Sequence, residues 1–189
     1  MKKNIRPVII IIVIVIAIGL PLISSYNSLV SLDQKVKAAE SNIDTLLDRR
    51  ASLIPNLVET VKGYAAQEKD IITDIANART KLIGSSSLTE KANADTQLST
   101  ALSRLLVIVE KYPDLKSNEN FRDLTVALEG TENRIAIARQ DYNKGVDSYN
   151  SSVRRFPSSV TAKLFNFKER AYYKASLNAK EVPKVEFKK

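Results

Sequence analysis

The sequence contains no cysteine, no histidine and no tryptophan, and only five glycines among 189 residues. Without cysteine the chain has no disulfide, no thiol nucleophile and no cysteine that a lipid could modify. Without histidine it lacks the commonest metal ligand and the commonest general base. Scarce glycine beside many Ala, Leu, Lys, Arg and Glu residues favours helices.

The usual sequence signatures of an active site are also missing. There is no GxSxG motif, no SxxK motif beside a plausible base, and no glycine-rich phosphate loop beyond Gly84 before a serine run. The di-iron sites of helical bundles need Glu-x-x-His pairs, which this chain cannot supply. Carboxylates at Glu40, Asp44, Glu59 and Glu132 are better explained as solvated helix faces than as a metal site. We therefore expect no enzyme, no catalytic residue, no cofactor and no metal.

The basic residues gather at the two ends of the chain. The formal net charge is +8, of which residues 1–6 carry +3 and residues 154–189 carry +7, so the centre is left with −2. A nucleic-acid-binding domain usually carries a basic stripe on its folded surface. Basic ends around a nearly neutral centre favour membrane flanks instead, and we expect no nucleic-acid partner.

One long apolar run follows the basic N-terminus. Residues 8–23 read VIIIIVIVIAIGLPLI, without a charged residue, and would span roughly 24 Å as a helix. This run predicts a transmembrane signal-anchor helix over residues 7–25, after a short tail over residues 1–6. The SSYNS that follows offers only a poor signal-peptidase site, so an uncleaved anchor is the better reading. The residues that mark the span are Val8, Ile12, Ile16, Gly19, Pro21 and Ile23.

The charges around this run predict its orientation. Lys2, Lys3 and Arg6 precede it, and the first basic residue after it is Lys35. The positive-inside rule then places a cytoplasmic N-terminus and the rest of the chain on the outer face of the cell membrane, with the opposite topology as the alternative.

Apolar residues recur at helical spacing from Leu29 to Leu82, and again over about 89–111 and 118–155. Pro55 interrupts the first of these stretches, as a kink within one helix or as a turn that opens a new one. Long helices and short connections predict an all-α fold in which an antiparallel up-down bundle of long helices, like a four-helix bundle, occupies residues 26–157.

Polar residues beside the apolar stripes could bind a partner or merely fix the structure. Asn42 and Asp44 are read more readily as a buried polar pair that fixes helix register. Arg49 and Arg50 pair with carboxylates on a neighbouring helix or lie in solvent. Tyr142 and Tyr149, seven residues apart, share one face and are expected in the core with the hydroxyl groups at its rim. The candidate structural or partner-contact residues are Asn42, Asp44, Arg49, Arg50, Pro55, Asn56, Pro113, Asp114, Tyr142 and Asn143.

The tail over residues 158–189 mixes basic and aromatic residues, as a short helix followed by an extended or disordered stretch. It could lie on anionic headgroups, or it could be a solvated tail. The candidate membrane-surface contacts are Arg154, Arg155, Lys163, Phe165, Lys168, Arg170, Tyr172 and Tyr173.

Several stretches together resemble the LemA family along nearly the whole chain. They are YNSLV at 26–30, SNIDTLLDRR at 41–50, LIPNLVETVKGYAAQE at 53–68, YPDLKSNENF at 112–121, LEGTENRIAIARQDYN at 128–143, YN at 149–150 and FP at 156–157. The resemblance implies a short N-terminal tail, one transmembrane helix and an antiparallel four-helix bundle. A related branch of this family works in the magnetosome membranes of magnetotactic bacteria. The resemblance implies no chemical reaction for this chain.

Two functions remain open on this reading. The first is a membrane-anchored scaffold or adaptor that organises other membrane proteins, or copies of itself, beside the bilayer. The alternative is a ligand- or lipid-binding sensor with a pocket between helices near Pro55. No small-molecule substrate is indicated.

Overall fold

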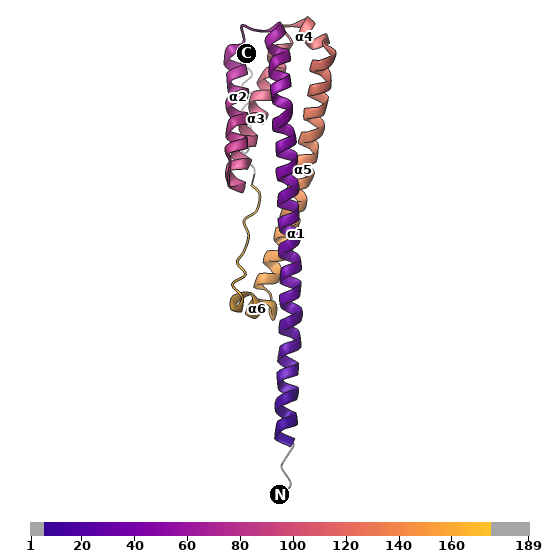
Figure 1. The fold of residues 1–189 in the computed structure, drawn as a ribbon, viewed down its shortest axis with the longest axis vertical. Helices are drawn as coiled ribbons and strands as arrows, with labels where there is room; N and C mark the ends of the chain where they lie inside the picture. The colour runs from indigo at the N-terminus through magenta and orange to yellow at the C-terminus, as the bar shows by residue number, and fades with distance from the viewer. Residues whose placement is uncertain (1–5, 175–189) are drawn as a thin grey trace, which may run out of the picture. The chain divides into compact units, whose positions relative to one another are not determined.

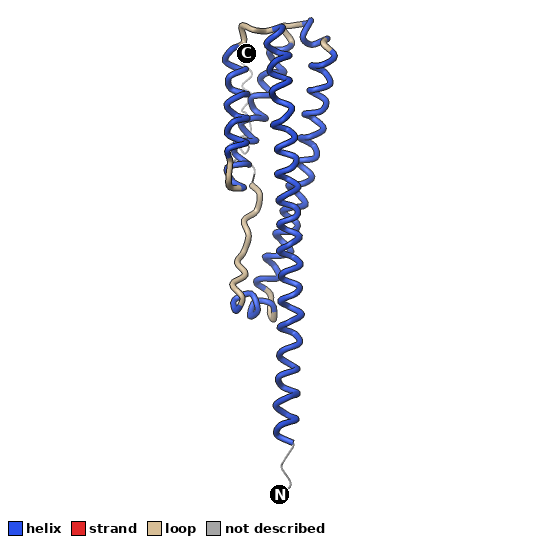
Figure 2. The backbone as a smooth tube through the Cα atoms, viewed as in Figure 1, coloured by secondary structure: helices blue, strands red, loops and turns tan. Residues whose placement is uncertain are grey.

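A computed structural model describes residues 6–174; in helix α1 the side chains of residues 6–8, 11, 12, 14, 15 and 18 lie outside the description. The described chain is helical almost throughout and contains no strand (Figures 1 and 2). This confirms the all-α class. The helices are α1 (Arg6–Tyr64), α2 (Lys69–Gly84), α3 (Leu88–Val109), α4 (Pro113–Ser117), α5 (Glu119–Arg154) and α6 (Ser158–Leu164).

The predicted membrane span begins helix α1. Among the described residues, no helix combines the length and the apolarity needed to cross a membrane, so the structure does not support the transmembrane helix expected at 7–25. Of the residues that marked it, Ile16 and Ile23 are exposed, whereas the side chains of Val8 and Ile12 lie outside the described part. Large exposed hydrophobic side chains recur along this stretch: Ile9, Ile10, Val13, Ile16, Leu20 and Ile23.

The chain divides into two compact units. Among the described residues, the first unit joins residues 6–41 to 140–172, and the second unit joins residues 42–139 to 173 and 174. Helices α1 and α5 each contribute one part to both units. In the second unit, the end of α1, all of α2 and α3, and the start of α5 lie side by side as four segments joined by short connections (Figure 1).

Helix α1 runs through Pro55 without ending. Of the two readings left open at Pro55, the turn is therefore wrong, and the helix continues to Tyr64. A proline removes the amide that would bond the carbonyl four residues earlier, here that of Ala51. The side chain of Arg79 on α2 replaces it, because its Nε donates to the Ala51 carbonyl oxygen at 2.9 Å. A tertiary contact thus satisfies the group that the proline leaves unpaired.

The first break in the helices comes instead at residues 65–68, which the sequence reading had placed inside one apolar stripe. Tyr112 organises this end, since its hydroxyl donates to Glu68 at 2.8 Å and accepts from Gln67 at 2.9 Å. Two later helices have side-chain caps. Ser87 and Glu90 form a capping box at α3, and Asn118 Oδ1 accepts the amide of Phe121 at 3.0 Å at the start of α5.

The predicted apolar stripe forms the core. Leu29, Val36, Ile43, Ile54 and Ile75 are all at most 1% exposed, whereas Tyr64, at 45%, is the exception. In the first unit Gly145 of α5 faces Val36 of α1, where an added Cβ would be 3.5 Å from Val36 Cγ2. Burying one such aliphatic side chain contributes about 1.5–3 kcal/mol, so the packed stripe is the main source of stability.

Candidate functional sites

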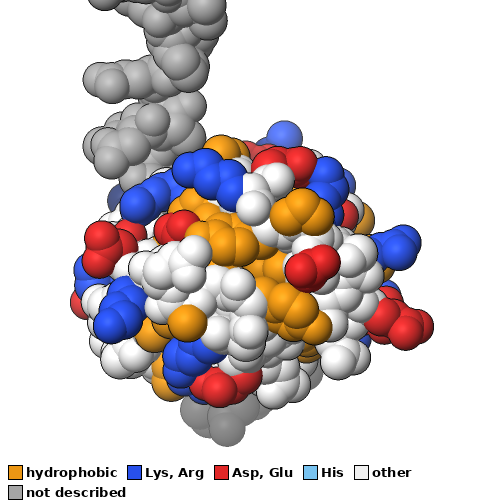
Figure 3. Space-filling view, turned by 90° about the horizontal axis from the view of Figure 1, so that it is seen from above, with side chains coloured by type: hydrophobic (Ala, Val, Ile, Leu, Met, Phe, Trp, Pro, Cys, Tyr) orange, Lys and Arg blue, Asp and Glu red, His pale blue; other side chains and the backbone are white. Residues whose placement is uncertain are grey.

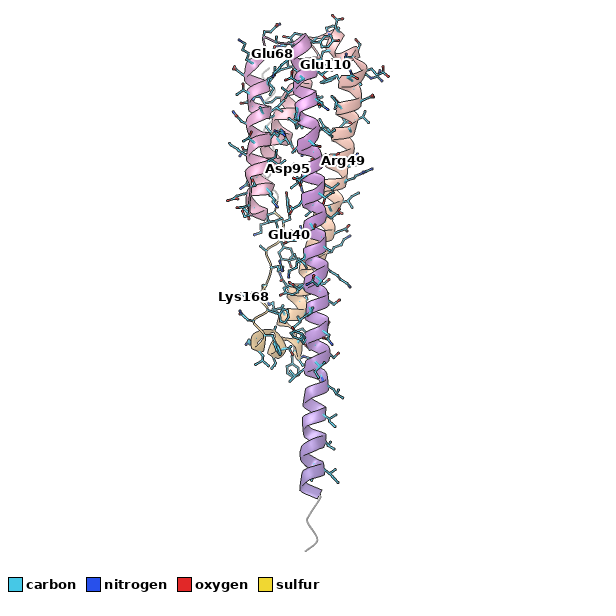
Figure 4. The ribbon with its side chains drawn as sticks, in the orientation of Figure 1. Glu40, Arg49, Glu68, Asp95, Glu110 and Lys168 are labelled. Atoms are coloured by element: carbon cyan, nitrogen blue, oxygen red, sulfur yellow. The ribbon has the colours of Figure 1, made fainter. Side chains whose placement is uncertain are left out.

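The first candidate site is an ionic cluster inside the second unit, made of Arg50, Asp95, Glu132 and Arg139. Each residue stands on an apolar stripe: Arg50 on α1, Asp95 on α3, and Glu132 and Arg139 on α5. Asp95 is fully buried and Arg50 is only 3% exposed. Asp95, which lies on α3, is labelled in Figure 4.

The cluster is a connected network rather than a set of separate pairs. Arg50 Nη1 donates to Asp95 Oδ1 at 2.5 Å and lies 2.5 Å from Glu132 Oε2. Arg139 Nη2 donates to the other carboxylate oxygen, Asp95 Oδ2, and Arg139 Nη1 lies 3.9 Å from Glu132 Oε1. Two guanidinium groups and two carboxylates make the cluster formally neutral. Neutrality and mutual hydrogen bonds are what allow charges to stay buried.

An aromatic ring covers one side of the cluster. The guanidinium carbon of Arg139 lies 5.0 Å from the centre of the Tyr173 ring, which is a cation–π geometry. Tyr173 is buried, and burial raises the pKa of its hydroxyl; Arg139 works in the opposite direction and Asp95 reinforces the rise. Tyr173 therefore belongs to the interior of the second unit and does not fit its predicted role as a membrane-surface contact.

A cavity opens beside the ionic cluster. Its volume is about 400 Å³, and Arg50 and Glu132 contribute to its lining. Most of the wall is apolar and comes from α1, α3 and α5. The sequence predicts a pocket near Pro55. Pro55 is exposed and does not line this cavity, whereas Leu57, two residues later on α1, does.

The second candidate site lies in the first unit, where the segment after α6 packs on α1. The Tyr26 ring lies 4.8 Å from the Phe165 ring and 5.8 Å from the Phe167 ring, measured between centres. Aromatic pairs at this spacing are worth about 0.5–1.5 kcal/mol beyond the area they bury. Because Tyr26 follows the apolar run so closely, these contacts place α6 beside the end of that run.

Asn150 fixes the extended stretch after α6. Its amide nitrogen donates to the Arg170 carbonyl at 2.9 Å, and its amide oxygen accepts the Arg170 backbone amide at 2.8 Å. Tyr142, also on α5, donates a hydrogen bond from its hydroxyl to the Ala171 carbonyl oxygen at 2.9 Å. The stretch is therefore attached to α5 through its backbone, and Tyr142 and Tyr149 are buried in the core as the sequence predicts.

Arg170 is held inside this unit by acidic residues of α1. Its Nε and Nη2 donate to Asp33 Oδ1 at 3.0 and 2.7 Å, and its Nη1 lies 3.8 Å from Glu40 Oε2. Burial pushes the pKa of Asp33 upward, but hydrogen bonds from Lys37 and Arg170 outweigh it and hold that pKa below its ordinary value of 3.8. Arg170 is therefore half-buried and paired with α1, and its contact with a membrane surface stays a prediction.

Other members of the predicted tail set remain on the surface around α6. Of that set, Phe165 is 52% exposed; Phe156 and Leu164, which the prediction did not include, are 79% and 69% exposed. We call the aromatic–basic surface the exposed set of Arg154, Arg155, Phe156, Val160, Lys163, Leu164 and Phe165. Lys168 is exposed on the extended stretch (Figure 4), and the Tyr172 hydroxyl donates to Asp147 at 3.2 Å. Residues 175–189 of the predicted tail lie outside the described part of the chain.

The predicted polar motifs are separated by the structure. Asn42 is exposed and Asp44 forms an ion pair with Lys91 at 2.7 Å, so the expected buried polar pair is wrong. Arg49 is exposed, whereas its neighbour Arg50 is the buried member of the ionic cluster. Asn56, Pro113 and Asp114 are exposed, and Asn143 is half-buried on α5.

Sequence reasoning missed Asp95 and Arg139, and treated Glu132 only as a surface carboxylate. The signal was present: Arg50 is in phase with Ile43, Leu47 and Ile54, and Asp95 is in phase with Leu98. A charge in phase with an apolar stripe faces the core and needs a partner there. Within the described residues, no three acidic side chains converge as a metal site would require.

Comparison with known proteins identifies the family. The model of the LemA family matches residues 39–187. This chain belongs to the LemA family. The resemblance seen in the sequence motifs is thereby confirmed.

Named relatives of this LemA-family chain include magnetosome proteins. The magnetosome protein MamQ 2 of Paramagnetospirillum magneticum is 28% identical over 84% of this chain and 68% of its own length. MamQ of Magnetospirillum gryphiswaldense is 26% identical over 80% of this chain and 65% of its own length. Protein LemA of Metamycoplasma hominis is 23% identical over 79% of this chain and 69% of its own length.

Proposed function

We propose that this LemA-family protein is a non-enzymatic scaffold attached to a membrane by the N-terminal part of helix α1. The observation that carries the proposal is the contact of Tyr26 with Phe165 and Phe167 in the first unit. It brings the aromatic–basic surface beside the C-terminal end of the apolar run of residues 8–23. Apolar and basic surfaces that meet in this way suit a bilayer, whose acyl chains take the first and whose anionic headgroups take the second.

The exposed side chains of α1 support attachment. Ile10, Val13, Leu20 and Ile23 are between 57% and 64% exposed, and residues 8–23 include no charge. A row of large hydrophobic groups in water is unfavourable by about 25 cal/mol for each Å². In this proposal the run inserts as an anchor, with the N-terminus in the cytoplasm and the bundle on the outer face.

The aromatic–basic surface would lie on the same membrane. Each basic residue near an anionic surface contributes about 1 kcal/mol. Arg155 and Lys163 are exposed, so each would make this contribution. Arg154 lies 3.7 Å from Glu169, whose negative charge offsets part of the attraction between Arg154 and the anionic surface. Phe156 and Leu164 add apolar area that can enter the headgroup layer.

The second unit would present the surface for partners. On the face seen in Figure 3, hydrophobic side chains gather near the middle, with Lys, Arg, Asp and Glu side chains around them. An apolar centre with a polar rim is typical of protein–protein contacts. The partners we propose are other membrane proteins or a second copy of the chain, with a buried ionic cluster keeping the bundle in one register.

The absence of cysteine allows a direct test of attachment, since any introduced thiol is unique. Asn4→Cys and Ser86→Cys variants are expressed in cells and treated with a membrane-impermeant maleimide, before and after lysis. We expect Ser86→Cys to react in intact cells and Asn4→Cys only after lysis. Equal reaction of both thiols in intact cells would show that the anchor does not cross the membrane, and loss of the protein from washed membranes would reject attachment altogether.

Contact of the aromatic–basic surface is tested with nitroxide labels on the full chain in vesicles that contain anionic lipid. A label at Leu164→Cys should be more accessible to dissolved oxygen, which concentrates among acyl chains, than a label at Val126→Cys. Val126 is the matched control, because it is 67% exposed but lies on α5 in the second unit. Equal oxygen accessibility at the two sites would contradict this contact.

The scaffold role is tested by crosslinking in intact membranes. A bifunctional lysine reagent should give discrete larger species that contain this chain. Recovery of the monomer alone, at a reagent dose that crosslinks a known complex in the same membranes, would count against it.

A further inference from the structure

The cavity beside the ionic cluster has the size and the lining of a ligand site. Its volume of about 400 Å³ lies within the range of about 300–1,000 Å³ that small-molecule sites occupy. All of its lining residues belong to the second unit. The apolar part of the wall consists of Leu57, Leu102, Leu105, Leu106, Phe121 and Leu128.

A buried, unsatisfied donor belongs to the polar end of this wall. Arg50 is 3% exposed, and its Nη1 is engaged by Asp95 and Glu132, but its Nε has no hydrogen-bond partner. Leaving a buried donor unpaired costs about 1–3 kcal/mol, and more for a charged group. Because Nε has almost no accessible surface, a small shift of the Arg50 side chain toward the cavity would let a ligand oxygen accept from it and remove this cost.

A second polar atom beside it can accept. Glu132 Oε2 is buried and, although it forms an ion pair with Arg50, it accepts no hydrogen bond. A ligand head group that both accepts and donates, such as a hydroxyl or a primary amide, could use the two atoms at once. A simple ether or ester oxygen accepts only, and could use Arg50 alone.

The charges around the cavity select against an ionised ligand. The ionic cluster is already neutral, so an added carboxylate would meet Glu132 without a free positive charge to balance it. Glu129, also in the lining, adds a further negative charge. An added ammonium would stand next to the buried Arg50. Burying an unbalanced charge is far more costly than burying a hydroxyl.

We propose that this cavity binds an uncharged amphiphile, with an aliphatic chain against the leucines and Phe121 and a hydroxyl or primary amide between Arg50 Nε and Glu132 Oε2. The site does not depend on membrane attachment or on the scaffold role. Binding of this ligand is compatible with membrane attachment and with the scaffold role.

The test uses protection of a single thiol in the full chain, purified in detergent. Ser103→Cys places the thiol in the lining of the cavity at an exposed position, and Asn133→Cys is a second variant of the same kind. Asn93→Cys, exposed on α3 outside this lining, is the control. The probes are 1-decanol, decanamide, decanoate and decylamine, and the readout is the rate of maleimide modification.

We expect decanol and decanamide to slow modification at Ser103→Cys and Asn133→Cys by about tenfold at ten times their Kd, and to leave Asn93→Cys unchanged. Decanoate and decylamine should protect much less at equal concentration. Leu106→Trp, which places a larger side chain in the lining, should abolish protection of Ser103→Cys without changing the helical circular dichroism.

Three results would overturn the proposal. Equal protection by all four probes would mean that the detergent or the chain length, and not the head group, decides. No protection at either lining position would mean that the cavity binds none of them. Protection that grows with protein concentration in the absence of a probe would mean that a second copy of the chain fills the cavity.

Discussion

Removing the charge of Asp95 should destabilise the second unit more than any comparable change on its surface. Asp95 is completely buried and accepts hydrogen bonds from both Arg50 and Arg139. Asp95→Asn keeps the size of the side chain but leaves two guanidinium groups with Glu132 as the remaining carboxylate of the cluster. Breaking a buried ion pair by removing one partner costs about 3–5 kcal/mol. In a chain of this length that corresponds to a fall in Tm of about 6–20 °C.

The matched control is Asp74→Asn. Asp74 pairs with Arg104 at 2.7 Å, but these two side chains are 46% and 58% exposed. An exposed pair contributes about 0–1 kcal/mol, so this variant should unfold nearly as the parent does. Urea unfolding of the full chain, followed by helical circular dichroism, measures both variants under the same conditions.

A double variant separates the loss of a pair from the loss of packing. Arg50→Met with Asp95→Leu removes the buried pair as a unit and leaves Arg139 to Glu132, its neighbour at 3.9 Å. Replacing a buried pair by apolar groups of similar volume is often neutral or stabilising. The double variant should therefore be more stable than Asp95→Asn. If Asp95→Asn costs less than about 1 kcal/mol, or no more than Asp74→Asn, the cluster does not contribute to stability as its geometry implies.

Three further predictions concern single interactions. Because the pKa of Asp33 is lowered in the folded state, its ionised form stabilises the fold at pH values above 3.8, and this stabilisation is lost as the pH falls through the folded-state pKa. Asp33→Asn should therefore flatten the acid limb of a curve of stability against pH, and an unchanged limb would contradict this. Ser87→Ala removes the cap of α3 and should cost about 0.5–2 kcal/mol in urea unfolding. Arg79→Met leaves the Ala51 carbonyl unpaired and should cost about 1–3 kcal/mol, and less in a Pro55→Ala background that restores the helical amide; equal costs in both backgrounds would refute the compensation.

Periodicity determined which residues form the core. The stripe from Leu29 to Leu82 follows from the 3.6-residue repeat of a helix, and its members are buried with Tyr64 as the exception. The ends of the later helices were also readable, because Tyr112–Pro113 and the Phe156–Pro157 step interrupt helical patterns in chemically specific ways. Local geometry alone fixes both kinds of feature.

The effect of Pro55 could not be read locally. Whether a proline ends a helix depends on whether the carbonyl it leaves unpaired finds another donor, and here that donor is Arg79, on a different helix. The segment at residues 65–68 likewise contacts Tyr112, which is 44 residues from Glu68, and the local sequence does not show this contact.

The ionic cluster marks the boundary between what the sequence and the tertiary structure decide. The phase of the apolar stripe already places Arg50, and not Arg49, toward the core. The sequence cannot say which carboxylates meet Arg50, since Asp95 and Glu132 lie on other helices and their approach depends on how those helices pack. The cavity beside Arg50 has the same origin, because its volume is left between α1, α3 and α5 and belongs to no single helix.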